Sequence, residues 1–408
     1  PQRMISTAGV RSFAARRMTK RASAVTDRVV SKTKPSKPPT RLIVAPSEHD
    51  ADMLYATRMF VGDPFIFLEQ GGKRTILLSD LEIDRGRRQA QVDEILSYGQ
   101  FEREVQGKAK KAPAFEKVLT HFLRTRGVRS AVVPSSFPLG YAEELSRANI
   151  RLQTTNGLFW PEREAKTEEE LKQMRRALSI TEKGMARAVE VLGACKARRG
   201  KRLDWFGRVL TSEILRAEID SAILRAGGLP ANTIVAGGDQ ACDPHERGSG
   251  PLYADSLIIL DIFPRDAASG YFGDMTRTVV RGRASEEQRR LWETVRKGQE
   301  LALKKMKPGV DGLEVHNEVK QLFTDQGYPT EVRDGRQVGF FHGTGHGLGL
   351  EIHEFPRFQK TVFKPGQVLT VEPGLYYPGL GGVRIEDVAV VTETGNRIIS
   401  KFEKRLEI

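Results

Sequence analysis

Hydrophobic and polar residues alternate in two ways along this chain, and each way predicts a different kind of element. Apolar residues at helical spacing predict helices over 50–60 and 114–125. Short apolar runs between turn residues predict four strands in the same region: 41–45, 65–68, 75–78 and 130–133. This mixture predicts a small α/β domain with a mixed sheet over residues 41–163.

Longer helical patterns follow Trp160 and Pro161. Thr167, with Glu170 three residues later, has the form of a capping box and predicts a helix that runs to about Leu192. Three more helices are expected, each ended by glycine or by Pro-Gly: 204–226, 285–307 and 312–326. Strand patterns lie between and after these helices. Residues 164–408 therefore predict an α+β domain with helices packed on a curved antiparallel sheet.

Most of the net charge of +13 belongs to the N-terminal segment. Residues 1–41 contain eleven Lys and Arg and one acid, a balance of +10, which leaves the other 367 residues at about +3. We expect residues 1–40 to be a disordered basic tail. Its Arg- and Ser-rich, acid-poor composition also fits an organelle transit segment. A nucleic-acid-binding arm is a third interpretation, but we expect no nucleic-acid partner.

Other features of composition limit the class of protein. No run of 18 apolar residues occurs, so we expect no transmembrane helix and no membrane partner. Cys195 and Cys242 lack the spacing of a metal or redox motif, which argues against a disulfide scaffold and fits a reducing compartment. We therefore expect a cytoplasmic protein, unless residues 1–40 direct it to an organelle.

Candidate metal ligands occur in order in the last third of the chain. The carboxylates lie at or beside the ends of apolar strand patterns, where a buried charge needs a partner. The set consists of Asp261, Asp274, His346, Glu372 and Glu386. Four carboxylates and one imidazole suit two adjacent hard divalent cations, with Mn²⁺ favoured and Co²⁺, Zn²⁺ or Fe²⁺ permitted.

Several of these ligands also have a simpler interpretation. A hairpin would place Asp261 beside Asp274, but Asp266 is a competing candidate, and acids at strand ends often only cap turns. Glu386 shares one face of a strand with Arg384 by the alternation of side chains, so these two residues could form a structural ion pair instead. These alternatives apply to single segments and fit the complete set poorly.

Histidines gather around the candidate ligand His346. His342, His346 and His353, three of the seven in the chain, lie within twelve glycine-rich residues. A lone histidine is more often a packing residue, but a cluster of this kind favours metal or acid–base chemistry.

These segments, with 232–235 and 245–247, closely resemble the metallopeptidase family of Xaa-Pro aminopeptidase, prolidase, creatinase and methionine aminopeptidase. The resemblance covers residues 41–408. It implies a pita-bread catalytic domain over 164–408, preceded by a creatinase-like α/β domain over 41–163. It also implies a peptide substrate with an Xaa-Pro N-terminus and a homodimer.

The resemblance also implies roles for individual residues. Asp261, Asp274, His346, Glu372 and Glu386 are expected to hold two metal ions. Glu372 is also expected to carry protons, and His353 and His245 to donate to the developing oxyanion. His342, Arg384 and Arg357 are expected to lie in or behind the substrate pocket.

The sequence departs from the family pattern at one loop, and two other features limit which member of the family it resembles. The loop 264–270 is two residues longer than usual, which makes Asp274 the least secure ligand. The N-terminal domain argues against methionine aminopeptidase, and the complete ligand set argues against creatinase and against non-catalytic members.

The sequence leaves the length of the substrate open. We rank Xaa-Pro aminopeptidase slightly ahead of proline dipeptidase. Arg357 could bind a dipeptide carboxylate through a two-pronged contact, or it could be an ordinary surface residue. A non-catalytic binding protein that uses the basic tail is a more remote alternative.

Overall fold

The computed structural model describes residues 38–155 and 157–408, of which residues 39–408 form one unit. The predicted tail and its transit or nucleic-acid alternatives fall almost entirely on residues 1–37, outside the described part. The predicted boundary between 163 and 164 lies inside the described unit and stays a prediction.

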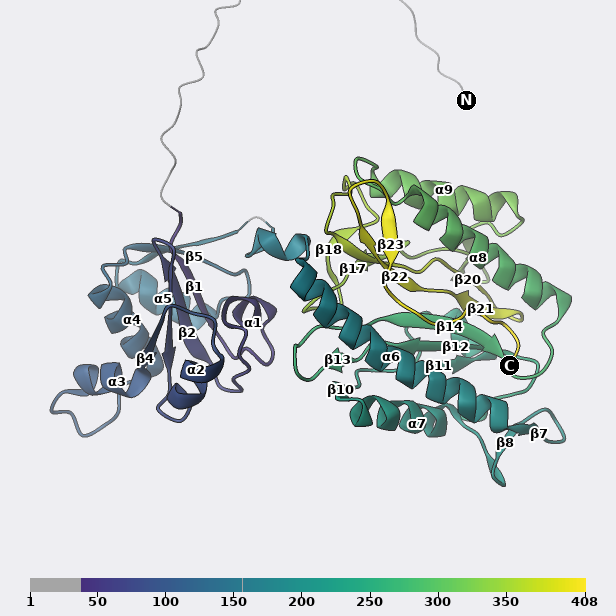
Figure 1. The fold of residues 1–408 in the computed structure, drawn as a ribbon, viewed down its shortest axis with the longest axis horizontal. Helices are drawn as coiled ribbons and strands as arrows, with labels where there is room; N and C mark the ends of the chain where they lie inside the picture. Colours follow the sequence, from purple (N-terminus) through teal and green to yellow (C-terminus); the bar gives the residue numbers. More distant parts are fainter. Residues whose placement is uncertain (1–37, 156) are drawn as a thin grey trace, which may run out of the picture. The chain divides into compact units, whose positions relative to one another are not determined.

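The first half of the described chain contains the mixed sheet that the pattern predicted (Figure 1). Its strand order is β4-β3-β2-β1-β5-β6, with β2 antiparallel to both neighbours and the other pairs parallel. The strands are β1 (Arg41–Ala45), β2 (Phe65–Gln70), β3 (Lys73–Leu78), β4 (Glu94–Ser97), β5 (Ser130–Val133) and β6 (Arg151–Thr154). The helices are α1 (Ala51–Thr57), α2 (Ile83–Gln89), α3 (Tyr98–Gln106), α4 (Phe115–Thr125) and α5 (Leu139–Arg147). The helix α1 is shorter than predicted because Arg58 has a left-handed φ of 55° and ends it.

The long helix α6 (Glu168–Ala194) follows the short 3-10 helix η1 (Pro161–Glu164). The capping box predicted from Thr167 and Glu170 is present at its start. The helix predicted over 204–226 is wrong in its first part. Leu203 and Leu210 are buried in a hairpin, so helix α7 (Ser212–Arg225) begins only after Thr211 caps it.

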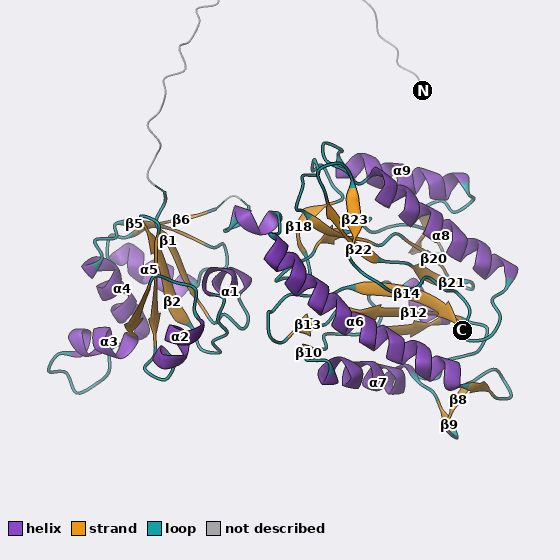
Figure 2. Cartoon of the chain, viewed as in Figure 1, coloured by secondary structure: helices purple, strands orange, loops and turns teal. Residues whose placement is uncertain are grey.

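The second half of the described chain is built from helices and antiparallel sheets, as predicted (Figure 2). Helices α6 and α7 share a hydrophobic core with the sheet β11-β12-β14. Helices α8 (Glu286–Lys305) and α9 (Gly312–Asp325) share another core with β19, β21 and β22.

The strands up to β14 are β7 (Lys196–Ala197), β8 (Leu203–Trp205), β9 (Arg208–Val209), β10 (Gly228–Leu229), β11 (Ile234–Gly237), β12 (Leu257–Ile262), β13 (Arg265–Asp266) and β14 (Met275–Val280), with the 3-10 helix η2 (Gly238–Cys242). The later strands are β15 (Glu331–Arg333), β16 (Arg336–Val338), β17 (His346–Gly347), β18 (Glu354–Arg357), β19 (Val368–Val371), β20 (Gly374–Tyr377), β21 (Gly381–Arg384), β22 (Asp387–Val391) and β23 (Asn396–Ile398).

The longer loop before Asp274 forms a small structure of its own. Its strand β13 pairs with β10, and the buried Asp266 accepts a hydrogen bond from the Ser269 hydroxyl at 2.6 Å. Asp266 also lies 3.4 Å from Arg176 on α6. Asp266, the competing ligand candidate, therefore stabilises the loop itself. Strands β12 and β14, which precede and follow the loop, pair with each other.

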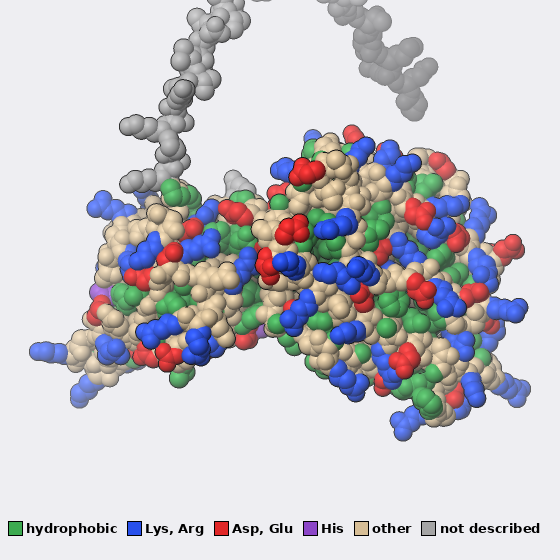
Figure 3. Space-filling view, viewed as in Figure 1, with side chains coloured by type: hydrophobic (Ala, Val, Ile, Leu, Met, Phe, Trp, Pro, Cys, Tyr) green, Lys and Arg blue, Asp and Glu red, His purple; other side chains and the backbone are tan. Residues whose placement is uncertain are grey.

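The surface carries charges of both signs. On the face in Figure 3, basic and acidic side chains are interspersed. None of the helices in the described part of the chain is long and apolar enough to cross a membrane.

Gly273 is expected to control how β14 packs on α6. A Cβ at this position would lie 2.4 Å from Thr181 Oγ1 and 2.6 Å from the Ala177 carbonyl oxygen. Gly273→Ala should therefore lower the free energy of unfolding by about 1–3 kcal/mol, because helix and strand must separate. Gly193→Ala is the matched control, since its Cβ would meet nothing within 4 Å. Thermal unfolding of both variants checks this, and equal midpoints would contradict it.

Candidate active site

The predicted metal ligands come from separate strand segments that the fold brings together. Asp261 lies on β12 and pairs in register with Thr276 on β14, directly after Asp274 and Met275. His346 begins β17, and the neighbouring β19 ends just before Glu372. Glu386 lies between β21 and β22, and its backbone N–H donates to the Thr276 carbonyl at 3.0 Å.

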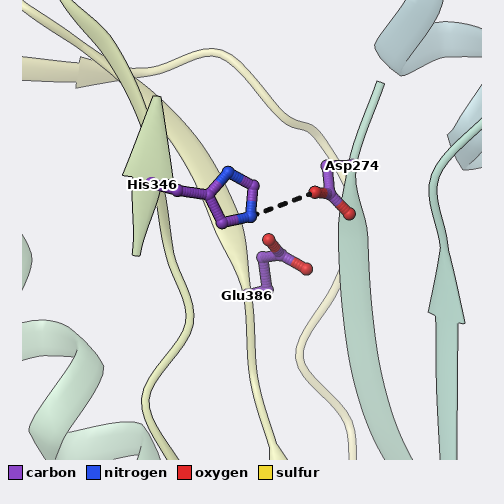
Figure 4. Close-up of side chains that lie close together, drawn as sticks. All are labelled: Asp274, His346 and Glu386. Carbon is purple, nitrogen blue, oxygen red and sulfur yellow. Dashed lines mark ion pairs between the residues drawn. The ribbon is translucent and has the colours of Figure 1, made fainter. Parts of the chain in front are cut away.

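Three of these side chains meet directly (Figure 4). Asp274, His346 and Glu386 each direct a ligand atom to one place, and these atoms lie within 4.8 Å of one another. His346 Nε2 is 3.8 Å from Asp274 Oδ2 and 3.2 Å from Glu372 Oε1. The longer loop therefore does not remove Asp274 from the cluster.

Thr276 joins Asp261 to the same cluster. Its hydroxyl lies 2.9 Å from Asp261 Oδ1 and 2.8 Å from Glu386 Oε2. A hydroxyl has a single proton, so it can donate to only one of these carboxylates at a time. All five predicted ligands are therefore connected, four by direct proximity and Asp261 through this threonine.

The electrostatics of the cluster require positive charge. Burial and the charge of Asp261 raise the pKa of Asp274, and burial and the charge of Asp274 raise that of Glu386. Burial raises the pKa of Glu372 to about 7. Arg384 is the buried cation that pairs with one of these carboxylates, Asp261, in the described part of the chain. Divalent cations would remove the repulsion and keep the carboxylates ionised.

One buried oxygen also fits a metal ion. Glu386 Oε1 has no hydrogen-bond partner among the described residues. An ionised carboxylate oxygen buried without a partner is costly, and a cation would satisfy it. The residues present therefore fit a pair of divalent cations.

The protonation of His346 also suits a ligand. Its Nδ1 lies 3.1 Å from the Gly347 carbonyl oxygen, which requires the proton on Nδ1. Burial lowers the pKa of the ring to about 4, so the ring is neutral at pH 7. The lone pair of Nε2 is thus free and directed toward Asp274 and Glu372.

A chain of hydrogen bonds supports Asp261 from behind. Arg384 donates to Asp261 Oδ2 at 2.8 Å and to the Tyr376 hydroxyl at 2.9 Å. Tyr376 in turn lies 2.8 Å from His342 Nε2 and donates to it, because His342 Nδ1 is used by the Gly343 carbonyl. Arg384 therefore pairs with Asp261, and the alternative ion pair with Glu386 does not form.

The remaining predicted residues lie at the edge of the cluster. His353 is exposed, and its ring centre lies 4.4 Å from that of His346 in an edge-on arrangement. Partial desolvation of the ring and the nearby His346 and Arg357 lower the pKa of His353 to about 4, which leaves a neutral ring able to donate one hydrogen bond. Arg357 is exposed and opposes His346 in the β17–β18 register. His245 is exposed and acts electrostatically on Glu372 and His353.

The residues that support the site were not predicted from the sequence. Thr370 Oγ1 accepts from the His346 backbone N–H at 3.0 Å and donates to Glu372 Oε1 at 3.1 Å. Thr276 and Tyr376 have the roles given above. The alternation of side chains could have indicated Thr276 and Thr370, since each lies two residues from a candidate ligand on the same strand face.

Comparison with known proteins agrees with this geometry. The model of metallopeptidase family M24 matches residues 172–393. The Xaa-Pro dipeptidase of Pyrococcus horikoshii is 31% identical over 300 residues, which are 72% of this chain and 79% of that protein. The Xaa-Pro dipeptidase of Pyrococcus furiosus is 33% identical over 247 residues, 59% of this chain and 64% of that protein.

Solved structures give the same result. The prolidase from Pyrococcus furiosus superposes with a TM-score of 0.71 at 25% identity, covering 90% of this chain and 97% of that one. The X-Pro aminopeptidase from Thermotoga maritima superposes with a TM-score of 0.75 at 23% identity, covering 91% and 97%. At 23% identity, the similarity to the X-Pro aminopeptidase supports the fold alone.

The pita-bread fold and the acidic cluster define a metal-dependent hydrolase. The chain belongs to metallopeptidase family M24. It is a peptidase, and membership of this family implies divalent metal ions. The predicted fold, family and enzyme class are confirmed.

Proposed function

We propose that this peptidase is an Xaa-Pro dipeptidase, with Xaa-Pro aminopeptidase as the second candidate. The sequence prediction ranked these two in the opposite order. The names of the relatives favour the dipeptidase, and so does the position of Arg357. Arg357 pairs with His346 across strands β17 and β18. Its exposed guanidinium lies close enough to lower the pKa of both His346 and His353.

We assign the four carboxylates and His346 as ligands of two divalent cations. Mn²⁺ suits this set best, since hard carboxylate donors dominate it. Bound ions of this kind supply a water that is acidic enough to act as a nucleophile at neutral pH. The homodimer expected from the resemblance stays a prediction.

Each neighbouring residue has a task in amide hydrolysis. Glu372, which bound cations would keep ionised, can accept the proton of the attacking water and return it to the departing proline nitrogen. The neutral ring of His353 can donate a hydrogen bond to the carbonyl oxygen as negative charge develops there, with His245 as a second donor. Arg384 and Tyr376 keep Asp261 in place.

Arg357 decides the length of the substrate in this proposal. A dipeptide ends in a carboxylate directly after proline, and a guanidinium binds a carboxylate through two parallel hydrogen bonds. Arg357→Met should therefore raise KM for an Xaa-Pro dipeptide by about 10- to 100-fold, the loss expected for a hydrogen bond to a charged group. Hydrolysis of the corresponding Xaa-Pro amide, which lacks the carboxylate, should change little.

The test compares wild type, Arg357→Met and Lys360→Met on Xaa-Pro, Xaa-Pro amide and Xaa-Pro-Yaa. Lys360 is an exposed cation three residues further along and serves as the matched control. Cleavage of Xaa-Pro by the wild type with a KM that depends on Arg357 supports the dipeptidase. Efficient release of Xaa from the tripeptide, without an effect of Arg357, would favour the aminopeptidase instead.

A further inference from the structure

A second group of buried charges lies beside the site, and none of its members is a metal ligand candidate. Its members are Arg163 in η1, Lys166, and Glu354 on β18. Their side chains are buried, with exposed fractions of 5%, 7% and 4%, respectively. Charged side chains are almost never buried to this extent unless they are paired. Their burial in one place therefore has to be explained by what they hold together.

These three residues are linked by short hydrogen bonds. Glu354 Oε1 accepts from Arg163 Nη2 at 2.5 Å, and Glu354 Oε2 accepts from Lys166 Nζ at 3.0 Å. Lys166 also donates to the Arg163 carbonyl oxygen at 2.8 Å. Burial alone would raise the pKa of Glu354, but the charges of Lys166 and Arg163 outweigh it and lower the pKa. Glu354 is thus a carboxylate at neutral pH.

The carboxylate of Glu354 organises the segment that carries His353. It accepts a hydrogen bond from the Glu351 backbone N–H at 3.0 Å, which closes the turn before His353. It also packs on Gly349 so closely that a Cβ there would lie 2.5 Å from its oxygen. Glu351 adds a second contact, 2.7 Å from Arg163 Nη2.

The ring of His353 depends on this backbone for its position. No hydrogen bond within residues 38–155 and 157–408 holds the ring, whereas His342 and His346 are each fixed by at least one. An imidazole that must meet a carbonyl oxygen within hydrogen-bond distance is sensitive to small displacements of the chain that carries it.

The other end of the cluster reaches the N-terminal half of the chain. Arg163 Nη1 donates to Asp52 Oδ1 on α1 at 2.7 Å, and the Asp52 carbonyl accepts from Trp160 Nε1 at 3.0 Å. Trp160 is fully buried in the core of that half. The guanidinium therefore connects α1 to the turn before His353.

We propose that Arg163, Lys166 and Glu354 are positioning residues that hold the backbone of residues 351–354, and through it the ring of His353, where it meets the substrate carbonyl. This inference rests on the proposed function, in which His353 donates to the developing oxyanion. It assigns the N-terminal half of the chain a part in catalysis, because Asp52 orients the guanidinium from the far side.

The decisive variant is Lys166→Met, which keeps the length of the side chain and removes its charge. We expect kcat to fall by about 10- to 100-fold, the cost of a misplaced catalytic group, with KM changed much less. Lys166→Arg should recover most of the loss. Asp52→Asn, at the half-buried end of the cluster, should show a smaller loss in the same direction. It provides a second test if Lys166→Met folds poorly.

A double-mutant cycle separates positioning from general structural support. In a His353→Ala background the Lys166→Met and Asp52→Asn changes should cost almost nothing further, because the group they position is absent. A purely structural role would lower activity by the same factor in both backgrounds. Arg58→Met is the matched control, since it breaks another half-buried pair, with Glu170, that has no contact with residues 351–354.

A readout without turnover uses metal-free protein. Backbone hydrogen exchange in residues 348–357 should be faster in Lys166→Met than in wild type, and unchanged in Arg58→Met. Faster exchange with non-additive losses in the cycle supports the proposal. Additive losses or unchanged exchange, with Xaa-Pro peptides hydrolysed by the wild type, would overturn the positioning role alone. A wild type that hydrolyses no Xaa-Pro peptide would overturn the proposed function, and this role of His353 with it.

Discussion

Removing divalent cations with a chelator is expected to abolish hydrolysis of Xaa-Pro peptides, and added Mn²⁺ should restore it. Without cations, four buried or half-buried acids lie in one region, and Arg384 pairs with Asp261 alone among them. Nothing then activates the water or offsets the repulsion. The assay is release of proline before chelation, after chelation and after Mn²⁺ is returned. Full activity in the chelated protein would contradict the metal assignment.

The same charges predict how the metal-free protein responds to pH. The folded pKa of Glu372 is about 7, raised from an ordinary 4.5, so the folded state binds the proton more tightly than the unfolded state. This contribution to stability is complete below about pH 4.5 and is lost as the pH rises through about 7. It amounts to roughly 3 kcal/mol by linkage. The pKa values of Asp274 and Glu386 are also raised in the folded state, so these acids change the pH dependence of stability in the same direction.

Thermal unfolding between pH 4.5 and 8 measures this effect. The unfolding midpoint of the metal-free protein should fall with rising pH, whereas Mn²⁺ should raise it at neutral pH, because the ion binds the ionised carboxylates of the folded state. Identical pH profiles with and without Mn²⁺ would show that these acids do not bind the ion.

Replacing Glu372 by glutamine is expected to lower kcat by about 10²- to 10⁴-fold, the range for loss of a general acid–base group. Glutamine keeps the shape and the contact with Thr370, but it cannot accept and return a proton. Glu393→Gln, at an exposed position outside the site, should be as active as wild type. The comparison requires kcat at saturating Mn²⁺ together with the metal content of each variant.

The result for Glu372→Gln is informative in both directions. A variant that keeps its metal ions and loses turnover supports proton transfer by Glu372. A variant with normal metal content and kcat within tenfold of wild type would rule out that role.

Much of this molecule could be predicted because its signals are local. Apolar runs beside acids indicated β12, β14, β19 and the segment 382–390, which the structure divides into β21 and β22 at Ile385 and Glu386. The helix starts at Thr167 and Ser285 depend on capping residues three positions apart.

What the sequence could not predict depends on contacts between distant segments. Residues 203–210 have an apolar content that suits a helix, yet packing of Leu203 and Leu210 into the core makes them a hairpin. Arg163 and Glu354 are 191 positions apart and carry no motif, so only the fold shows that they form a cluster. Tyr376 was missed for a similar reason, because its role comes from Arg384 and His342 on other segments.

Whether the acidic cluster is the catalytic metal centre is tested by a calorimetric titration of metal-free protein with Mn²⁺, with Xaa-Pro hydrolysis measured at each point. We expect two equivalents to bind per chain and activity to appear as they bind. Asp274→Asn should reduce the stoichiometry or the affinity, since this carboxylate lies within the cluster. Hydrolysis that proceeds without bound metal, or a protein that binds no Mn²⁺, would contradict the central claim that this acidic cluster is the catalytic metal centre.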